Sequence, residues 1–203
     1  MKQALVLFSF LLALMTYSKV YAMEKEEAFF AGGCFWCIES DFEKVNGVHE
    51  ATSGYTGGDE ANPTYAQVSA GRTGHAEAIR VVYDPQKVSY EQLLHIFWRS
   101  IDPSVKDRQF CDRGRQYRSA IFYKGEEQKK AAEKSLEQLK KGGRFAQVYT
   151  ELEPLKTFYP AETYHQDYHR KNPIRYTFYR ARCGRDSRLS EIWGDEAGGQ
   201  STK

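Results

Sequence analysis

Gly33-Cys34-Phe35-Trp36-Cys37 joins two segments of different character. The residues before it predict a β-strand over 26–31, and those after it predict a helix over 35–45, so Cys34 stands where a helix begins. Unpaired backbone N–H groups and the helix dipole favour negative charge there. We therefore expect the Cys34 thiol to ionise readily and to act as a nucleophile. The aromatic residues Phe35 and Trp36 predict an apolar pocket beside this sulfur.

The first residues predict an export signal. Lys2 gives a positive start, an apolar run follows over residues 4–15, and Val20-Tyr21-Ala22 offers a cleavage site. The run is shorter than the roughly 20 apolar residues of an ordinary membrane span. We expect a signal peptide over residues 1–22, no membrane span after its removal, and an exported protein, most simply a periplasmic one. An uncleaved N-terminal anchor is the alternative.

The rest of the chain has the size of one domain, which we place at residues 23–193, with a flexible tail over 194–203. Removal of the signal lowers the formal charge of +2 to about zero, which gives no electrostatic case for binding nucleic acid. The local basic cluster of Arg182, Arg185 and Arg188 is typical of a solvated face.

Strands and helices alternate along the chain, but several strands are short and the connections are long. This pattern predicts an α+β protein, a two-layer α/β sandwich with a mixed sheet and a ferredoxin-like core. Further strands are expected over 48–53, 76–83, 119–123 and 147–152, and further helices from Ser89, over 126–141, over 162–170 and over 188–193. The long loops 54–74, 101–118 and 155–185 are rich in Tyr, Arg, Asp and His, which indicates function.

Four more motifs accompany residues 33–37. They are Asn62-Pro63-Thr64-Tyr65, Gly74-His75-Ala76-Glu77-Ala78, Gln116-Tyr117-Arg118-Ser119 and Tyr164-His165-Gln166. Together, in this order and spacing, the five motifs resemble the A-type peptide methionine sulfoxide reductases, from about residue 29 to about residue 183. The resemblance implies a monomer without a bound cofactor that reduces methionine-S-sulfoxide in proteins, and free methionine sulfoxide, to methionine.

The resemblance also assigns roles. Cys34 attacks the sulfoxide sulfur and ends as a sulfenic acid. Glu77 is the natural proton source, because a carboxyl group against apolar walls has a raised pKa and can stay protonated near neutral pH. Tyr65 and Tyr117 are expected to donate hydrogen bonds to the sulfoxide oxygen, and Asp112 to line the same pocket.

Phe35 and Trp36 are expected to form the apolar wall that accepts the substrate methyl group. His165 and His169 lie four residues apart and could share a helix face, which raises the alternative of a metal site. No third or fourth ligand is evident nearby. Because His165 belongs to a motif of the resembled family, we expect it to support the pocket and expect no metal.

The chain has three cysteines besides Cys34. A sulfenic acid condenses with a nearby thiol to give a disulfide. The resemblance favours Cys183 as the resolving cysteine, with Cys37 as the rival and Cys111 as a spectator thiol. It also implies a thioredoxin-like protein as external reductant, which in a periplasm has to belong to a reducing relay.

Two other functions remain open from the sequence. Cys34 and Cys37 could form the redox pair of a thioredoxin-like disulfide oxidoreductase. Alternatively, the four cysteines could build a structural zinc site or two structural disulfides in a protein that is not an enzyme. We prefer the reductase interpretation to both alternatives, with repair of oxidised envelope proteins as the biological role.

Overall fold

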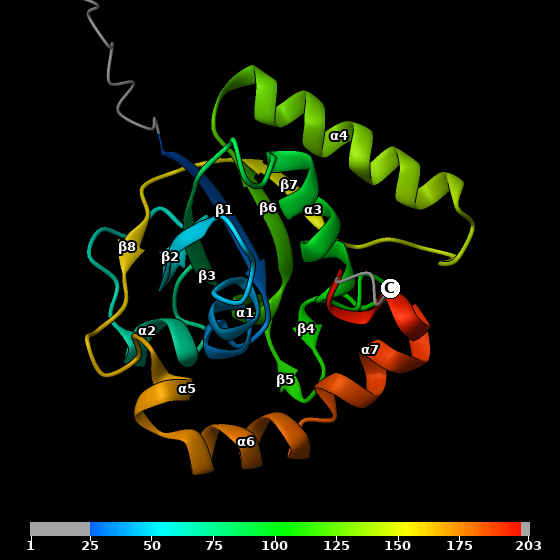
Figure 1. The fold of residues 1–203 in the computed structure, drawn as a ribbon. Helices are drawn as coiled ribbons and strands as arrows, with labels where there is room; N and C mark the ends of the chain where they lie inside the picture. Colours follow the sequence, from blue (N-terminus) through cyan, green and yellow to red (C-terminus); the bar gives the residue numbers. More distant parts are fainter. Residues whose placement is uncertain (1–24, 200–203) are drawn as a thin grey trace, which may run out of the picture.

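The computed structural model describes residues 25–199, so the predicted signal peptide lies outside the described residues. A six-stranded sheet in the order β7-β6-β1-β3-β2-β8 forms the centre (Figure 1). The strands are β1 (Glu26–Gly32), β2 (Val48–Thr56), β3 (Ala76–Tyr83), β6 (Ser119–Tyr123), β7 (Glu151–Pro154) and β8 (Tyr159–Pro160). Only β6 and β7 pair in parallel, and the other neighbours are antiparallel. This mixed sheet confirms the predicted α+β class.

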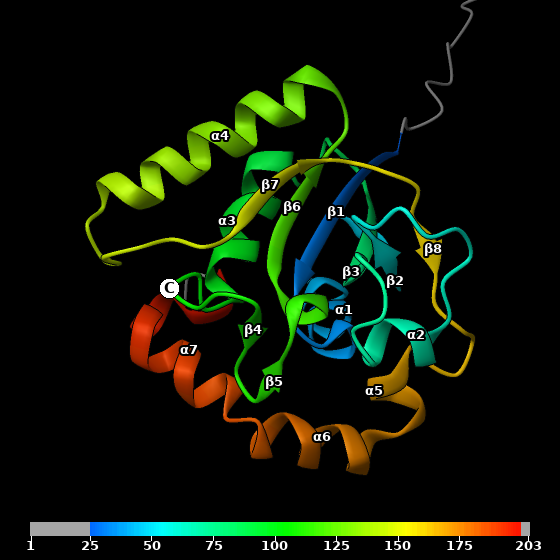
Figure 2. The same cartoon turned by 180° about the vertical axis from the view of Figure 1, so that it is seen from behind.

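Seven α-helices accompany the sheet in the described part of the chain. They are α1 (Phe35–Phe42), α2 (Tyr65–Ser69), α3 (Tyr90–Arg99), α4 (Gly125–Lys141), α5 (Tyr168–Lys171), α6 (Pro173–Arg182) and α7 (Arg185–Trp193). The segment from α5 to α7 runs past one end of the sheet, as both views of the ribbon show (Figures 1 and 2). Within residues 25–199, no helix is long and apolar enough to span a bilayer.

The alternation of side chains along β1 divides the core between the two faces of the sheet. Phe30 packs with the apolar residues of α1, α3 and α4, which cover one face. Phe29 points to the other face, where Leu155 and Phe158 of an irregular segment cover it. Successive residues of a strand point to opposite faces, so one strand serves both halves of the core. The result is a helical layer on one side of the sheet and a thin covering on the other.

Helix α3 begins as the sequence predicts. The Ser89 side chain accepts a hydrogen bond from the backbone N–H of Gln92, and the Gln92 side-chain oxygen accepts one from the backbone N–H of Ser89. This reciprocal pair satisfies two of the donors that a helix start leaves open. The predicted cap at Ser89 is therefore confirmed.

The strand expected over 147–152 is found as β7 at Glu151–Pro154, and three further expectations differ from the structure. The segment 155–185 is not a long loop, because it contains α5 and α6. The predicted flexible tail begins too early, because Gly194–Gly199 forms a 3₁₀ segment whose Glu196 pairs with Arg99. Arg185 does not lie on a solvated face: it is 1% exposed and donates hydrogen bonds to the backbone carbonyls that end β1 and α3.

Candidate active site

Cys34 occupies the position before the first residue of α1, as the sequence predicts. Gly33 makes the turn from β1 into the helix with a φ of +84°, a conformation that glycine adopts at little cost. The first amide of the helix, the N–H of Phe35, donates a hydrogen bond to Glu77 Oε2 at 3.1 Å. The turn therefore brings the sulfur of Cys34 and the carboxyl group of Glu77 to one helix N-terminus.

Glu77 lies on β3, on the face that packs against α1. Its neighbours Ala76 and Ala78 point to the opposite face. Burial raises the pKa of Glu77 to about 8, and the negative charge of Asp112 adds to this effect. The side chain is 2% exposed. Glu77 consequently carries a proton at neutral pH, as the sequence-based hypothesis of a proton source requires.

The ionisation expected of Cys34 is not found. Burial raises the pKa of the Cys34 thiol well above its ordinary value, and a hydrogen bond from Tyr179 opposes this only in part. The Cys34 residue is 6% exposed. Cys37 behaves differently: a hydrogen bond from Cys34 lowers its pKa, and the charges of Arg185 and Arg180 act in the same direction. Burial therefore favours the thiol form of Cys34 over the thiolate.

The two predicted tyrosine donors lie around Glu77. Burial raises the pKa of both Tyr65 and Tyr117, and in each case the Glu77 charge is the next largest cause. The charge of Cys34 also contributes to both values. Their hydroxyl groups therefore keep their protons and lie close to the acid and the sulfur. The structure brings these predicted residues together, and it leaves both tyrosines able to donate.

Asp112 joins the same group from the other side. Its Oδ2 accepts a hydrogen bond from the Tyr179 hydroxyl at 2.7 Å, and the backbone N–H of Cys34 is near enough to lower the carboxyl pKa slightly. Burial raises the pKa of Asp112. The sequence analysis missed Tyr179, although its spacing of three residues from Tyr176 after Pro173 is a helical signal.

An aromatic wall flanks Cys34. The ring nitrogen of Trp36 donates a hydrogen bond to His165 Nδ1 at 3.0 Å, and the Trp36 ring stacks on Tyr168 with centroids 3.7 Å apart. Phe35 packs against His165 with centroids 5.0 Å apart. Burial lowers the pKa of His165, so the imidazole is neutral and its proton lies on Nε2. The predicted supporting position of His165 beside the pocket agrees with this geometry.

The alternative metal pair of His165 and His169 does not form. His165 uses Nδ1 to accept from Trp36, whereas His169 Nε2 lies 3.2 Å from Glu43 Oε2. The two rings therefore have different partners. Within residues 25–199, neither histidine belongs to a group of three close metal-ligating side chains.

Glu39 is a further buried carboxylate that the sequence analysis missed. It lies on α1, accepts hydrogen bonds from the backbone N–H and the hydroxyl of Ser53 on β2, and accepts another from the backbone of Asp167 at 2.5 Å. Burial raises the pKa of Glu39 to about 7. These contacts tie the helix that begins at Cys34 to the segment that carries His165. The only sequence signal for this structural role of Glu39 is its place after Cys34 on the same short predicted helix.

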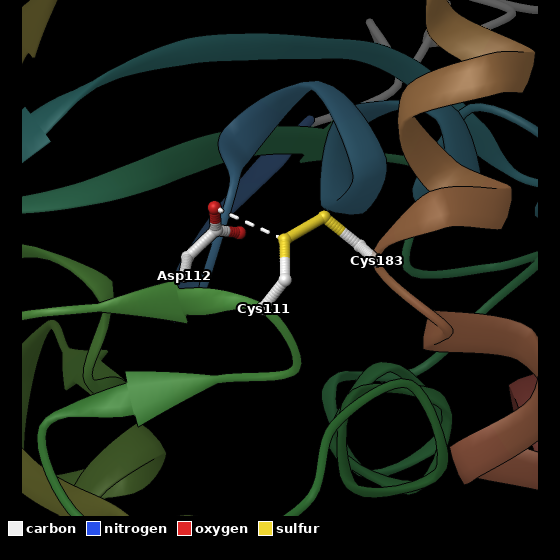
Figure 3. A group of neighbouring side chains, drawn as sticks. All are labelled: Cys111, Asp112 and Cys183. Atoms are coloured by element: carbon white, nitrogen blue, oxygen red, sulfur yellow. Dashed lines mark hydrogen bonds between the residues drawn. A yellow bond between two sulfur atoms is a disulfide. The ribbon is translucent and has the colours of Figure 1, made fainter.

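The other two cysteines form a disulfide. Cys111 and Cys183 are bonded, with their Cα atoms 4.8 Å apart and a sequence separation of 72 residues (Figure 3). The expectation of a spectator Cys111 is therefore wrong, and the structure contains no Cys34–Cys183 bond. Cys34 and Cys37 are buried free thiols, so the structure has one disulfide, and this bond is incompatible with a zinc site that uses all four cysteines.

Comparison with known proteins gives one family. The sequence model described as peptide methionine sulfoxide reductase matches residues 26–197. Over 175 residues the chain is 49% identical to peptide methionine sulfoxide reductase MsrA of Halalkalibacterium halodurans, covering 85% of this chain and 99% of the relative. It is 52% identical over 170 residues to MsrA/MsrB of Vibrio cholerae, covering 83% of this chain but 45% of that longer relative.

A solved structure has the same fold. The crystal structure of Mxr1 from Saccharomyces cerevisiae in reduced form superposes with a TM-score of 0.69 at 34% identity. The superposition covers 74% of this chain and 87% of the yeast chain.

Proposed function

Because the chain belongs to the peptide methionine sulfoxide reductase family and reduces methionine sulfoxide, we propose that Cys34 is the nucleophile and Glu77 the acid of this reaction. The proposal rests on one observation above all. A buried carboxyl group with a pKa of about 8 meets the helix N-terminus that carries the thiol. This arrangement places a soft nucleophile, which attacks the substrate sulfur, beside a proton donor for the departing oxygen.

The proposed step balances as follows. Glu77 gives its proton to the sulfoxide oxygen, and its carboxylate receives the proton of the Cys34 thiol. The Cys34 sulfur bonds to the substrate sulfur, the oxygen passes to Cys34, and methionine leaves. The products are methionine and a Cys34 sulfenic acid, while Glu77 is again protonated. Cys34 therefore needs to ionise only as the sulfoxide oxygen is protonated, which fits its raised pKa.

The surrounding residues hold the substrate. Tyr65 and Tyr117 donate hydrogen bonds to the sulfoxide oxygen, and donors of this type in a dry site contribute a few kcal/mol. Phe35 and Trp36 contact the methyl group, and His165 holds the Trp36 ring in place through its hydrogen bond of 3.0 Å. Asp112 lies beside Cys34 and is itself held by the hydrogen bond from Tyr179.

A single-turnover experiment tests the role of Glu77. The protein is mixed with methionine-S-sulfoxide without reductant, and released methionine is measured. Glu77→Gln is expected to slow the release by about 10²–10⁴-fold, the range of general acid catalysis. Glu91→Gln, a change on the exposed surface of α3, serves as the matched control and is expected to behave like the native protein. Equal rates for both variants would refute the role of Glu77.

Family membership argues against the thioredoxin-like alternative for Cys34 and Cys37. The same Glu77→Gln variant gives a direct comparison, because disulfide exchange between small dithiols does not need this acid. Loss of methionine release with unchanged dithiol exchange is the expected result.

A thioredoxin-like protein is the reductant that we propose. Cys34 and Cys37 are buried, whereas Cys111 is exposed, so a protein dithiol can reach the Cys111–Cys183 disulfide and not the inner pair. Assays that supply a thioredoxin system in place of a small dithiol test this proposal. Turnover should stop in such assays when both Cys111 and Cys183 are replaced by Ser.

The proposed substrates are oxidised proteins and free methionine sulfoxide, both as the S epimer at sulfur. We place the monomeric enzyme outside the cytoplasm, most simply in a periplasm, where it repairs oxidised envelope proteins. The support for this location is the apolar run at residues 4–15 with its small-residue cleavage site. Fractionation of cells that express the chain, with N-terminal sequencing of the mature protein, tests it.

A further inference from the structure

Cys111 lies at the tip of a short hairpin that packs directly on the Cys34 turn. Strands β4 (Arg108–Gln109) and β5 (Asp112–Arg113) pair so that Gln109 faces Asp112, which leaves Phe110 and Cys111 as the two turn residues. A side-chain carbon on Gly33 would lie 2.6 Å from Cβ of Gln109. The hairpin and the residue before Cys34 are therefore in contact.

The base of this hairpin is fixed. Gln109 is buried, and its side chain both donates to the Asp102 carbonyl at 2.7 Å and accepts the Asp102 N–H at 2.9 Å. The guanidinium group of Arg185 lies over the Phe110 ring, 4.5 Å from its centroid. Cys111 itself is exposed. The surrounding residues consequently hold the tip next to the site while its sulfur stays accessible.

One carboxylate separates the two redox centres. Asp112 Oδ1 lies 3.6 Å from Cys111 Sγ, and the Asp112 side chain is directed at the disulfide (Figure 3). Cys34 lies close enough to both Asp112 and Tyr179 to influence the pKa of the carboxyl group and to have its own pKa influenced by the hydroxyl group. Tyr179 donates a hydrogen bond to Asp112 Oδ2 at 2.7 Å. Asp112 is therefore a neighbour of both Cys34 and Cys111, with Tyr179 beside it.

We propose that Cys111 is the resolving cysteine that attacks Cys34, that Asp112 takes the proton of Cys111, and that Cys183 acts second. The proposal rests on the formation of a sulfenic acid at Cys34. It corrects the sequence-based preference for Cys183 in the first attack. It also gives Asp112 a role in resetting the enzyme, beyond its place at the substrate pocket.

The two steps balance. Asp112 accepts the proton of the Cys111 thiol, the Cys111 sulfur bonds to the Cys34 sulfur, and the departing hydroxide takes the proton from Asp112 and leaves as water. The Cys183 thiolate then attacks the Cys111 sulfur, and Cys34 leaves and recovers a proton as a thiol. Cys111 and Cys183 together supply the two electrons. The products are a free Cys34 and a Cys111–Cys183 disulfide, the pairing found in the structure.

Burial of the carboxyl group supports its service as a base. It raises the pKa of Asp112, which brings the carboxylate closer to the range in which it accepts a proton from a thiol near neutral pH. The Tyr179 hydrogen bond keeps one oxygen in place, so that the other remains directed at Cys111.

A matched pair of variants tests which outer cysteine attacks. Cys37→Ser with Cys183→Ser leaves Cys34 and Cys111, and Cys37→Ser with Cys111→Ser leaves Cys34 and Cys183. Each is mixed with methionine sulfoxide without reductant, and methionine release and disulfide formation are followed by rapid quenching and mass mapping. We expect the Cys34–Cys111 bond to form at least tenfold faster than the Cys34–Cys183 bond. Equal rates, or a faster Cys34–Cys183 bond, would overturn the proposal.

The native four-cysteine chain gives a second measurement, which does not depend on how the variants fold. A Cys34–Cys111 bond should appear transiently before the Cys111–Cys183 bond. A transient Cys34–Cys183 or Cys34–Cys37 bond in its place refutes the proposed order. Release of methionine reports on the sulfenic acid step separately, so absence of that release marks a failure of the proposed function and removes the basis of this inference with it.

Asp112→Asn tests the base. In the variant that retains only Cys34 and Cys111, the added substitution should let the sulfenic acid accumulate after methionine is released, where a 1,3-diketone reagent traps it. Asp107→Asn is the matched control, because Asp107 lies in the same loop, is partly exposed and pairs with Arg115 at 3.4 Å. Disulfide formation that follows methionine release without delay in Asp112→Asn would exclude the role as base.

Discussion

The Phe35 amide and the Glu77 carboxyl group are joined by a hydrogen bond of 3.1 Å that links β3 to the first turn of α1. This bond favours the ionised carboxylate, yet burial outweighs it and raises the pKa of Glu77 to about 8. The backbone therefore orients the acid without removing its proton. Two properties that the reaction needs, a fixed position and a retained proton, thus come from separate physical causes.

The rate of methionine release is expected to fall above about pH 8. The active form carries a proton on both Glu77 and Cys34, and burial holds the pKa of Glu77 at about 8 while that of Cys34 lies higher. Glu77 is therefore the first of the two to lose its proton as the pH rises. Single-turnover rates between pH 6 and pH 10 measure this effect. A rate that keeps rising through this range would show that ionisation of Cys34, and not protonation of Glu77, limits the step.

The same pKa predicts how stability depends on pH. Between the ordinary value of 4.5 and the folded value of about 8, the unfolded chain releases a proton from Glu77 that the folded protein retains. The free energy of unfolding therefore falls as the pH rises through this window, by an amount on the order of a few kcal/mol. Urea unfolding at pH 5 and pH 8 should show a smaller decline for Glu77→Gln than for the native chain. An identical decline in both proteins would mean that Glu77 is not protonated when folded.

Trp36→Phe is expected to weaken substrate binding. The change removes the hydrogen bond to His165 and reduces the stacking on Tyr168 while it keeps an aromatic ring. We expect KM for methionine sulfoxide to rise about tenfold, an effect on the order of 1.4 kcal/mol, with a smaller change in kcat. Trp98→Phe is the control, because Trp98 is buried on α3 and its ring nitrogen donates to Ser135 at 3.1 Å. A KM change of the same size in both variants would point to general loosening of the fold.

How well the sequence predicts a structural feature depends on whether the signal for it is local or comes from residues far apart in the chain. The alternating pattern at residues 76–83 predicts β3 with its observed bounds. The alternation of side chains along a single strand is visible in the local sequence. Helix α6 was missed, since it presents Ile174 and Phe178 to solvent and buries Tyr176, which leaves no simple apolar stripe.

The same distinction holds for the residues of the active site. Cys34 is predictable because it lies in a local motif at the junction of a strand and a helix, and Glu77 because it lies in a local motif within a strand. The pairing of Cys111 with Cys183 spans 72 residues, and four cysteines allow three pairings, so only the fold can choose among them. Burial of the Cys34 thiol likewise depends on Tyr176 and Tyr179 of α6. An argument from the position of Cys34 at the start of a helix does not include these distant residues.

Arg185→Met should destabilise the protein by about 3–5 kcal/mol. The buried guanidinium group donates to the carbonyl of Gly32 at 3.2 Å and to that of Ser100 at 2.7 Å, and methionine leaves both acceptors unpaired. Arg182→Met serves as the control, because Arg182 is exposed and its guanidinium group lies over the Phe178 ring, so a change below about 0.5 kcal/mol is expected. Urea unfolding of both variants measures the difference. Similar changes in the free energy of unfolding for the two variants would mean that Arg185 lies on a solvated face, as the sequence alone indicates.

Gly33→Ala combines two costs at the turn that presents Cys34. Its φ of +84° disfavours any side chain, and the added carbon would lie 2.6 Å from Cβ of Gln109, the residue at the base of the Cys111 hairpin. We expect a loss of roughly 2–3 kcal/mol in stability, and slower disulfide formation after methionine release because the hairpin has to move away from Cys34. Gly143→Ala isolates the backbone cost, since Gly143 has a φ of +65° but no atom within 4 Å of the added carbon. It should lose only about 1 kcal/mol and resolve its sulfenic acid at the native rate. If Gly33→Ala matches Gly143→Ala in both measurements, the contact between the hairpin and the Cys34 turn does not govern the resolving step.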